Sequence, residues 1–361
     1  MDYTGGPLFI HVDITERCNL RCIHCRNEIS NSIKKELPIE KFKNFIDKCS
    51  IIFPNFKQVF IGGGEPLIRK DELFELIAYC TKKDLKCSLN TNATLINKED
   101  LNKLTPLSAI QVSLDGACAT THDKIRGIPG SFDKAIENIK LLVKNNFYVC
   151  VRMTLFDFNY DEVFDLLDIC KKLGVNSFSW FRVLPAGKGE KIKDYSLDPK
   201  IYYLIMKELI RLKYELKDEI KIVSSEPSKI VLDASLRNEI ISKYGTNIVS
   251  GCIPGHIEFF VNAFGDIYPC TMLQQFKLGN ILKDNIKEVW SNSKVLNDLR
   301  NRQNLKGCCG ICDLKGLCGG CRATAFGLKR DIFEEDPYCP KKFMNRKIKI
   351  INKIRSPCQS Y

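Results

Sequence analysis

Short apolar runs alternate with longer segments of helical periodicity through the first half of the chain. The runs are rich in β-branched and aromatic residues and predict strands at 8–14, 57–61, 85–90, 109–114, 148–154 and 177–183. Apolar residues at helical spacing between them predict helices at 38–52, 71–82, 131–145 and 161–173. This alternation indicates βα units around a parallel sheet. Six units cannot close an eight-stranded barrel, so we expect an α/β fold with an open, partial (β/α)6 TIM-like barrel.

The pattern changes after the sixth predicted strand. Two long helical patterns between Asp198 and Tyr244 flank a short β-rich run at 220–224, which we expect to bridge two domains. Segments 257–261 and 265–270 then predict a β-hairpin, followed by loops rich in glycine and cysteine. We therefore expect a barrel at 1–190, a helical bridge at 191–250, a small cysteine-rich domain at 251–345 and a tail at 346–361.

Three closely spaced cysteines follow the first predicted strand. Cys18, Cys22 and Cys25 form the pattern CxxxCxxC. Thiolates hold iron–sulfur clusters, and a cube normally takes four of them, so three thiols leave one iron free for a small chelating molecule. Zinc binding or core packing is the alternative, but zinc sites usually close with four ligands that come as spaced pairs.

The last third of the chain carries a second group of cysteines at regular intervals. Its members are Cys252, Cys270, Cys309, Cys312, Cys318, Cys321 and Cys339. CxxC pairs serve zinc and iron–sulfur sites alike, so spacing alone leaves both open. Six other cysteines are scattered singly and are expected to be small buried apolar side chains: Cys49, Cys80, Cys87, Cys118, Cys150 and Cys170.

Polar residues collect where the predicted strands end, which is the working face of parallel barrels. The second strand runs into Gly63, Gly64, Glu65 and Pro66, where the glycines allow the backbone to approach a ligand. Asn90, Ser113 and Asp115 lie near the ends of the third and fourth strands. Arg152 lies within the apolar fifth strand and needs an anion or another partner there.

Composition narrows the class of protein. The chain has 361 residues, 44% of them hydrophobic, and 55 Lys and Arg against 43 Asp and Glu give a net charge of +12. The lysines are dispersed, so a solvated surface is expected, with an anionic substrate or acidic peptide as the alternative and no nucleic acid. No apolar run approaches the roughly 20 residues that span a bilayer, and the N-terminus lacks a signal-peptide pattern. We expect a cytoplasmic protein without a membrane partner.

Together these motifs resemble the radical S-adenosylmethionine superfamily, whose hallmark is CxxxCxxC. The resemblance implies a [4Fe-4S] cluster on Cys18, Cys22 and Cys25, with S-adenosyl-L-methionine chelating the open iron. Reductive cleavage of that cofactor then gives a 5′-deoxyadenosyl radical, which abstracts hydrogen from substrate. The resemblance also implies cofactor contacts at His24, Gly63, Gly64, Glu65, Pro66, Ser113 and Asp115. From their positions, Asn90 is a further candidate contact, and Arg152 a candidate partner of the methionine carboxylate, with a structural salt bridge to a strand-end acid as the alternative.

The seven later cysteines resemble the SPASM extension of the same superfamily, which binds two auxiliary [4Fe-4S] clusters. The resemblance assigns Cys252, Cys270 and Cys321 to the first cluster, and to the second Cys309, Cys312, Cys318 and Cys339. The first cluster then lacks a fourth ligand. That position is open to substrate, filled by another side chain, or taken by Cys308; Cys358 has no assigned role.

The leading functional hypothesis is a peptide or protein maturase. The rival is oxidation or decarboxylation of tetrapyrrole side chains, since the segment from Arg182 to Gly189 resembles one found in relatives of anaerobic haem synthesis. A non-enzymatic iron–sulfur scaffold or electron carrier is the third alternative. An enzyme of this type implies an electron donor such as flavodoxin or ferredoxin. Only seven residues precede the first strand, so a leader-binding protein is expected to be a separate chain.

Overall fold

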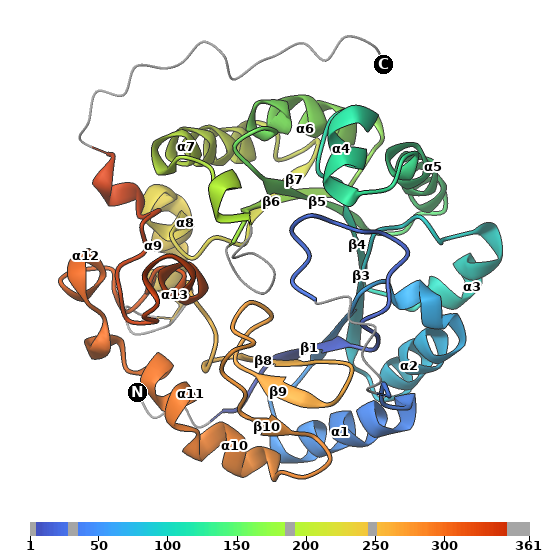
Figure 1. The fold of residues 1–361 in the computed structure, drawn as a ribbon, viewed down its shortest axis with the longest axis horizontal. Coiled ribbons are helices and arrows are strands. Elements are labelled where there is room, and N and C mark those ends of the chain that lie inside the picture. The colour runs from blue at the N-terminus through green and yellow to red at the C-terminus, as the bar shows by residue number, and fades with distance from the viewer. Residues whose placement is uncertain (1–4, 28–34, 185–191, 245–250, 345–361) are drawn as a thin grey trace.

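The computed structural model describes residues 5–27, 35–184, 192–244 and 251–344, and its strands form one ten-stranded sheet (Figure 1). The strand order is β10-β9-β8-β1-β2-β3-β4-β5-β6-β7, in which β8 and β1 to β7 are parallel and β9 and β10 are antiparallel additions. The strands are β1 (Phe9–Asp13), β2 (Gln58–Gly62), β3 (Lys86–Thr91), β4 (Ala109–Ser113), β5 (Val149–Leu155), β6 (Ser177–Arg182), β7 (Lys221–Ser224), β8 (Glu258–Val261), β9 (Asp266–Tyr268) and β10 (Gly279–Asn280).

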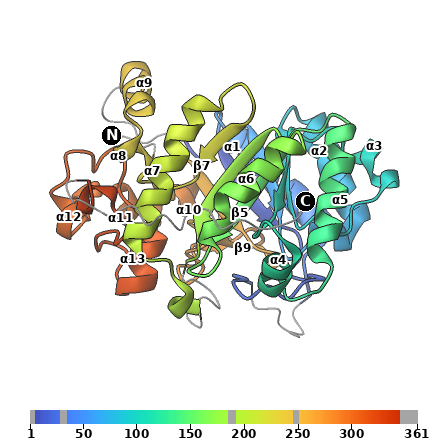
Figure 2. The same ribbon diagram turned by 90° about the horizontal axis from the view of Figure 1, so that it is seen from above.

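Helices surround the curved sheet, and the elements after β9 fill the sector of the ring between α9 and α1 (Figure 1). Turned by 90°, the elements α8 to α13 lie toward one side and α2 to α5 toward the other (Figure 2). The helices are α1 (Ile39–Ile52), α2 (Lys70–Lys82), α3 (Leu101–Leu104), α4 (Ala119–Arg126), α5 (Ser131–Lys144), α6 (Val163–Lys172), α7 (Pro199–Glu215), α8 (Lys229–Leu232), α9 (Ala234–Tyr244), α10 (Ile286–Asn292), α11 (Lys294–Arg300), α12 (Gly307–Gly310) and α13 (Arg322–Lys329).

The six predicted strands and four predicted helices are present, with ends that differ by one or two residues. The predicted hairpin is also confirmed, because β8 and β9 pair antiparallel. The run at 220–224 was expected to bridge two domains, and this was wrong. It forms β7, a seventh parallel strand that pairs with β6 from Ser177↔Lys221 to Trp180↔Ser224.

Strand β8 joins the cysteine-rich part of the chain directly to the barrel. It pairs in parallel with β1, from Phe9↔Glu258 to Val12↔Val261. The residues behind it are continuous with the barrel core, since one hydrophobic cluster contains Ile10, Phe259 and Trp290. Strand β1, which leads into the CxxxCxxC loop, is therefore bordered by β2 on one edge and by β8 on the other.

The two faces of the sheet differ in chemistry. Along β5 every second residue is fully buried among apolar neighbours, while Cys150, Arg152 and Thr154 alternate with these and are half-buried. Strand β4 repeats the pattern, with Gln111 and Ser113 half-buried. The helices pack on the apolar face (Figure 1). The concave inner face is thus polar and partly accessible.

Several expectations concern single residues or unassigned segments. Cys49, Cys80, Cys87 and Cys170 are buried in the core as predicted, whereas Cys118 and Cys150 are half-buried.

No helix in the described parts of the chain is long and apolar enough to cross a membrane. The predicted tail at 346–361, including Cys358, and positions 185–189 of the segment after β6 lie outside the described residues.

Candidate active site

The loop that follows β1 carries Cys18, Cys22 and Cys25. Contacts with the end of α4 and with the turn after β2 hold it in place. The backbone amides of Arg21 and Ile23 donate to the carbonyls of Arg126 and Ile125 at 2.9 and 3.0 Å. This ladder holds the middle of the loop against the end of α4. The three thiols thereby lie together near the carboxyl end of β1, where the sequence placed them.

Hydrogen-bond donors point at the sulfurs. Cys18 Sγ accepts from the Leu20 amide at 3.4 Å and from Asn92 Nδ2 at 3.9 Å. Cys22 Sγ accepts from Arg126 Nη1 at 3.6 Å. Burial raises the pKa of Cys18 to about 11, and the neighbouring Cys22 and Cys25 add to the rise. Donors and a buried cation beside thiols fit a metal cluster, because coordination deprotonates thiols and the ligated sulfurs then accept hydrogen bonds.

Gly63 and Gly64 pack on the backbone of the cysteine loop. The amides of Gly64 and Glu65 donate to the carbonyls of Thr15 and Arg17, both at 2.8 Å. A Cβ on Gly63 would lie 2.3 Å from the Thr15 oxygen, and one on Gly64 would lie 2.2 Å from the Arg17 oxygen. Sequence reasoning expected the glycines to admit a ligand. In the structure, the backbone of the cysteine loop occupies the space beside these glycines.

Glu65 is completely buried, and its carboxylate ties neighbouring segments together. It accepts from Thr91 Oγ1 and the Asn92 amide, both at 2.8 Å, and from the Leu67 amide at 3.2 Å. Burial raises its pKa, and these hydrogen bonds oppose the rise. Pro66 follows as the first residue of a 3-10 turn, Pro66–Arg69. A direct contact of Glu65 with the cofactor stays a prediction; within the protein its carboxylate accepts three hydrogen bonds.

Asp115 is also fully buried, and its carboxylate lies close to His24 of the cysteine loop and to Arg126. It pairs with Arg126 Nη2 at 2.6 Å and accepts from the Thr154 amide at 2.8 Å. The His24 Nε2 atom lies 3.8 Å from the same carboxylate. Burial lowers the pKa of His24 to about 4, so its ring is neutral near pH 7. The ring packs edge-on against Phe156. A cofactor contact of Asp115 stays a prediction; within the protein its carboxylate holds Arg126, which donates to Cys22.

Ser113 and Arg152 lie side by side on the inner face of the sheet. They are direct partners in the register of β4 and β5. The Arg152 guanidinium lies 5.6 Å from the centre of the Phe181 ring, and burial lowers its pKa. No carboxylate among the described residues forms an ion pair with it. A hydroxyl beside an arginine suits a carboxylate ligand. Asn90, on β3, is half-buried on the same face.

The later cysteines fall into two neighbourhoods, and the first joins Cys252, Cys270 and Cys321. Burial, followed by the nearby Glu258 carboxylate, raises the pKa of Cys270, and Cys252 and Cys321 add to the rise. Glu258 itself is buried and pairs with His11 at 3.4 Å. Phe260 pairs with Tyr268 in the β8–β9 register, and Glu258 precedes Phe260 by two residues while Cys270 follows Tyr268 by two. Glu258 was not among the site residues predicted from the sequence.

The second neighbourhood joins Cys309, Cys312, Cys318 and Cys339. Burial raises the pKa of Cys339, and Cys309 and Cys312 contribute to the rise. Cys308 belongs here as well, because Cys309 and Cys339 both help to raise its pKa after burial and Glu335. Its proposed role as fourth ligand of the first group therefore has no support from the structure.

The thiol groups are not arranged around single ions. In the described parts of the chain, no three or more His, Cys, Asp or Glu side chains are gathered closely enough to hold one metal ion. A cube places each thiolate on a different iron and does not impose that requirement.

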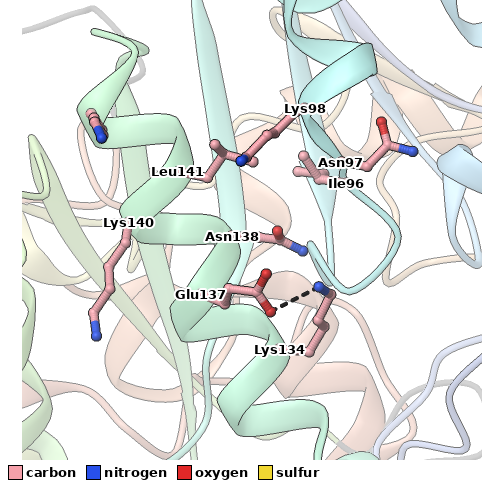
Figure 3. A pocket seen from close by; sticks show the side chains of 9 residues that line it. Ile96, Asn97, Lys98, Lys134, Glu137, Asn138, Lys140 and Leu141 are labelled. Atoms are coloured by element: carbon pink, nitrogen blue, oxygen red, sulfur yellow. Dashed lines mark hydrogen bonds and ion pairs between the residues drawn. The ribbon is translucent and has the colours of Figure 1, made fainter.

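A cavity of about 350 Å³ lies away from these sites, between α5 and the segment after β3 (Figure 3). Its lining includes Lys98, Lys134, Lys140 and Lys144 together with Glu137. None of the predicted site residues lines it.

Comparison with known proteins gives concordant matches. The model of the radical SAM superfamily matches residues 12–170, and that of an iron–sulfur cluster-binding domain, SPASM, matches 252–321. An AdoMet-dependent heme synthase of Methanosarcina barkeri is 33% identical over 93% of this chain and 97% of its own. The subtilosin biosynthesis protein AlbA of Bacillus subtilis is 30% identical over 87% of this chain and 67% of its own. The solved structure of anSMEcpe with bound AdoMet has a TM-score of 0.75, with 22% identity over 93% of this chain and 95% of that one.

Proposed function

Since the chain belongs to the radical S-adenosylmethionine superfamily and carries a C-terminal SPASM domain, we propose that it removes carboxylates oxidatively from side chains of a tetrapyrrole. One observation carries the choice of substrate: the heme synthase of M. barkeri is similar to this chain over nearly the full length of both. The enzyme uses S-adenosyl-L-methionine, a [4Fe-4S] cluster and auxiliary iron–sulfur clusters.

The residues around the first cluster have separate tasks in this proposal. Cys18, Cys22 and Cys25 hold the cube, which when bound supplies the electron that cleaves S-adenosylmethionine to a 5′-deoxyadenosyl radical. Ser113 and Arg152 take the methionine carboxylate from the inner face of the sheet. Glu65 and Asp115 act through the loops that they hold, since both carboxylates are buried and engaged.

The accessible polar face of the sheet suits a substrate with several carboxylates. Gln111, Thr154 and Cys150 lie on it around Arg152. In one turnover a side chain gives a hydrogen atom to the 5′-deoxyadenosyl radical, which thereby becomes 5′-deoxyadenosine. The side chain then loses carbon dioxide and one electron and keeps a new double bond. Iron–sulfur clusters are one-electron carriers, so the auxiliary clusters suit the task of accepting that electron.

The test uses anaerobically reconstituted protein with reductant and a tetrapyrrole that bears carboxylate side chains. We expect 5′-deoxyadenosine and carbon dioxide in equal amounts, with a product lighter by carbon dioxide and two hydrogens per reacted side chain. Release of 5′-deoxyadenosine without change in the tetrapyrrole would contradict the proposal.

A peptide is the second candidate substrate, and the likeness to AlbA favours it, because that relative is a bacteriocin biosynthesis protein. A heat-cleared extract of the source cells, treated or not with protease that is then removed, separates the two. Stimulation of 5′-deoxyadenosine release that protease destroys supports a peptide. Stimulation that survives protease supports the tetrapyrrole. No release with either preparation would contradict both.

A further inference from the structure

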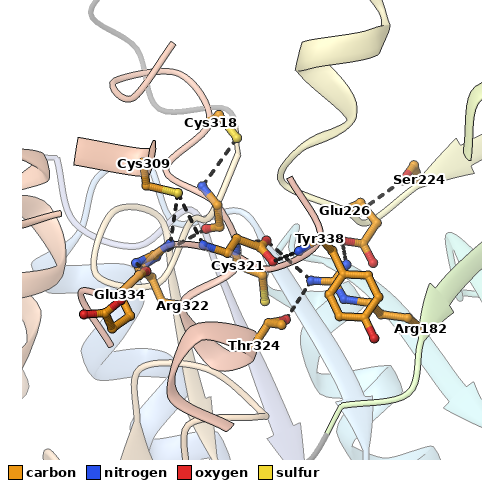
Figure 4. Close-up of polar contacts among 12 residues, drawn as sticks. Arg182, Ser224, Glu226, Cys309, Cys318, Cys321, Arg322, Thr324, Glu334 and Tyr338 are labelled. Carbon is orange, nitrogen blue, oxygen red and sulfur yellow. Dashed lines mark hydrogen bonds and ion pairs between the residues drawn. The ribbon is translucent and has the colours of Figure 1, made fainter. Parts of the chain in front are cut away.

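A cluster of buried charges lies where the barrel meets the SPASM domain (Figure 4). Arg182, at the end of β6, is enclosed completely and pairs with Glu226, from the segment after β7. It also contacts Asp336 at 3.5 Å and donates to Thr324 Oγ1 at 2.6 Å. The cluster thus connects the barrel wall to α13 and to the segment that follows it.

This cluster touches both groups of auxiliary thiols. The carboxylate of Asp336 accepts from the backbone amide of Cys321 at 2.8 Å, and Cys321 belongs to the first group. The backbone amide of Asp336 donates to Cys309 Sγ, in the second group, at 3.4 Å. Arg322 Nη2 also lies 3.8 Å from Cys309 Sγ. Asp336 is therefore in hydrogen-bond contact with one residue of each proposed ligand group.

Both signs of charge are present, and the buried Arg322 beside Cys309 adds a second cation to this region. One arginine faces two carboxylates, and all three side chains are at least 99% buried. Asp336 accepts from the Cys321 amide, so the three charges lie beside a residue of the first thiol group, with little water to screen them.

We propose that Arg182, Glu226 and Asp336 are positioning residues that set the reduction potentials of the auxiliary clusters, the first cluster above all. A cluster gains negative charge when it is reduced. A nearby cation therefore raises its potential, and a nearby carboxylate lowers it. The inference rests on the proposed ligand groups and not on the choice of substrate.

The test compares reconstituted holoprotein variants by redox titration with electron paramagnetic resonance. Glu226→Gln removes one negative charge and should raise the potential of the first auxiliary cluster. Arg182→Gln should lower it, and Arg182→Lys should restore most of the wild-type value. The radical SAM cluster should keep its potential in all three. Arg211→Gln, at an exposed arginine paired with Glu208 and Glu215, should shift nothing.

A merely structural ion pair predicts a different outcome. Losing either partner would then weaken cluster retention without shifting potentials in opposite directions, and that result, or equal potentials in all variants, overturns the proposal. If Arg182→Gln does not retain iron, the nearly isosteric Glu226→Gln decides alone. Cys321→Ala tests the ligand groups separately. If this variant keeps the signal of the first auxiliary cluster, Cys321 is not its ligand. The shifts in Glu226→Gln and Arg182→Gln then decide the electrostatic effect independently.

Discussion

The cysteine loop and the glycine-rich turn fit each other at the level of single atoms. A Cβ added at Gly64 would lie 2.2 Å from the Arg17 oxygen, so no side chain fits there. Replacing Gly64 by Ala should therefore separate the two segments and break two backbone hydrogen bonds, each worth about 1 kcal/mol. We expect Gly64→Ala to lose the iron of the first cluster, about four atoms per chain, and to bind S-adenosylmethionine weakly. Iron analysis and equilibrium binding measure both.

Gly130→Ala is the matched control for this change. Gly130 has a φ of +81°, but a Cβ there would meet nothing within 4 Å. The substitution costs about 1 kcal/mol of backbone strain and should leave iron content unchanged. Equal iron loss in both variants would show that chain conformation, rather than the contact with the loop, matters.

His122 makes stability depend on pH. Its Nδ1 atom accepts from the Asp115 amide at 3.0 Å, and burial together with Arg126 lowers its pKa to about 4. As the pH falls from 6.5 to 4, the unfolded chain binds a proton that the folded chain does not. The free energy of unfolding should therefore fall by up to about 3 kcal/mol across that window. Chemical denaturation of iron-free protein, compared with His122→Asn, isolates the effect. Parallel profiles for the two proteins would contradict it.

Residue types and spacings predict that Cys18, Cys22 and Cys25 share one loop and that rim residues collect at strand ends, whereas the grouping of the later thiols came from the resemblance to the SPASM extension. Residue types and spacings did not predict the partners of Glu65 and Asp115. Those partners, Asn92 and Arg126 among them, come from separate loops, and no local pattern in the sequence connects them. Glu258 was missed for the same reason, since its proximity to Cys270 depends on the pairing of β8 with β9.

At the scale of elements, β8 is the connection on which the site depends. Phe259 is fully buried and packs edge-on against Trp290 at 4.7 Å. Phe259→Ala should lower the free energy of unfolding by about 3–5 kcal/mol and loosen β1, which borders β8. We therefore expect loss of iron from the first cluster as well as from the auxiliary clusters. Denaturation and iron analysis test this.

Leu282→Ala is the corresponding control in the same part of the chain. Leu282 is 50% exposed, so its truncation should change stability by less than about 0.5 kcal/mol and leave all iron in place. Normal retention of the first cluster in Phe259→Ala would show that β8 does not support the loop.

Element types were largely predictable, whereas strand partners across the chain were not. Periodicity identified β1 to β6 because each is followed by a helix, which is the repeating unit of a parallel sheet. The run at 220–224 has only four paired residues and no regular unit around it, so nothing local showed that it extends the sheet. The pairing of β8 with β1 depends on contacts distant in sequence.

For the whole molecule, the family assignment predicts three separable clusters. Replacing Cys18, Cys22 and Cys25 together by Ala should abolish 5′-deoxyadenosine formation and leave about eight of about twelve iron atoms per chain. The auxiliary groups are built from other segments, so their spectra should persist. Cofactor cleavage by the triple variant, or loss of all iron, would contradict this separation.

From the sequence motifs alone, a peptide was the leading expectation for the substrate and a tetrapyrrole the second; we reverse that order because of the likeness to a heme synthase. Substrate choice depends on the shape of the accessible face around Arg152, to which several strands contribute. Short motifs do not encode such a shape. The radical chemistry, by contrast, rests on motifs that are local.

The pairing of β1 with β8 also has a temporal consequence. About 250 residues separate the two strands, and at roughly 5–20 residues per second a ribosome needs about 12–50 seconds to make that interval. During this time one edge of the first strand has no neighbour, while the three cysteines that follow it are already synthesised. The first loop can therefore bind its metal in the final geometry only after the last third of the chain has been made. Until then the strand edge is exposed, and during this period the nascent chain is most open to misassociation.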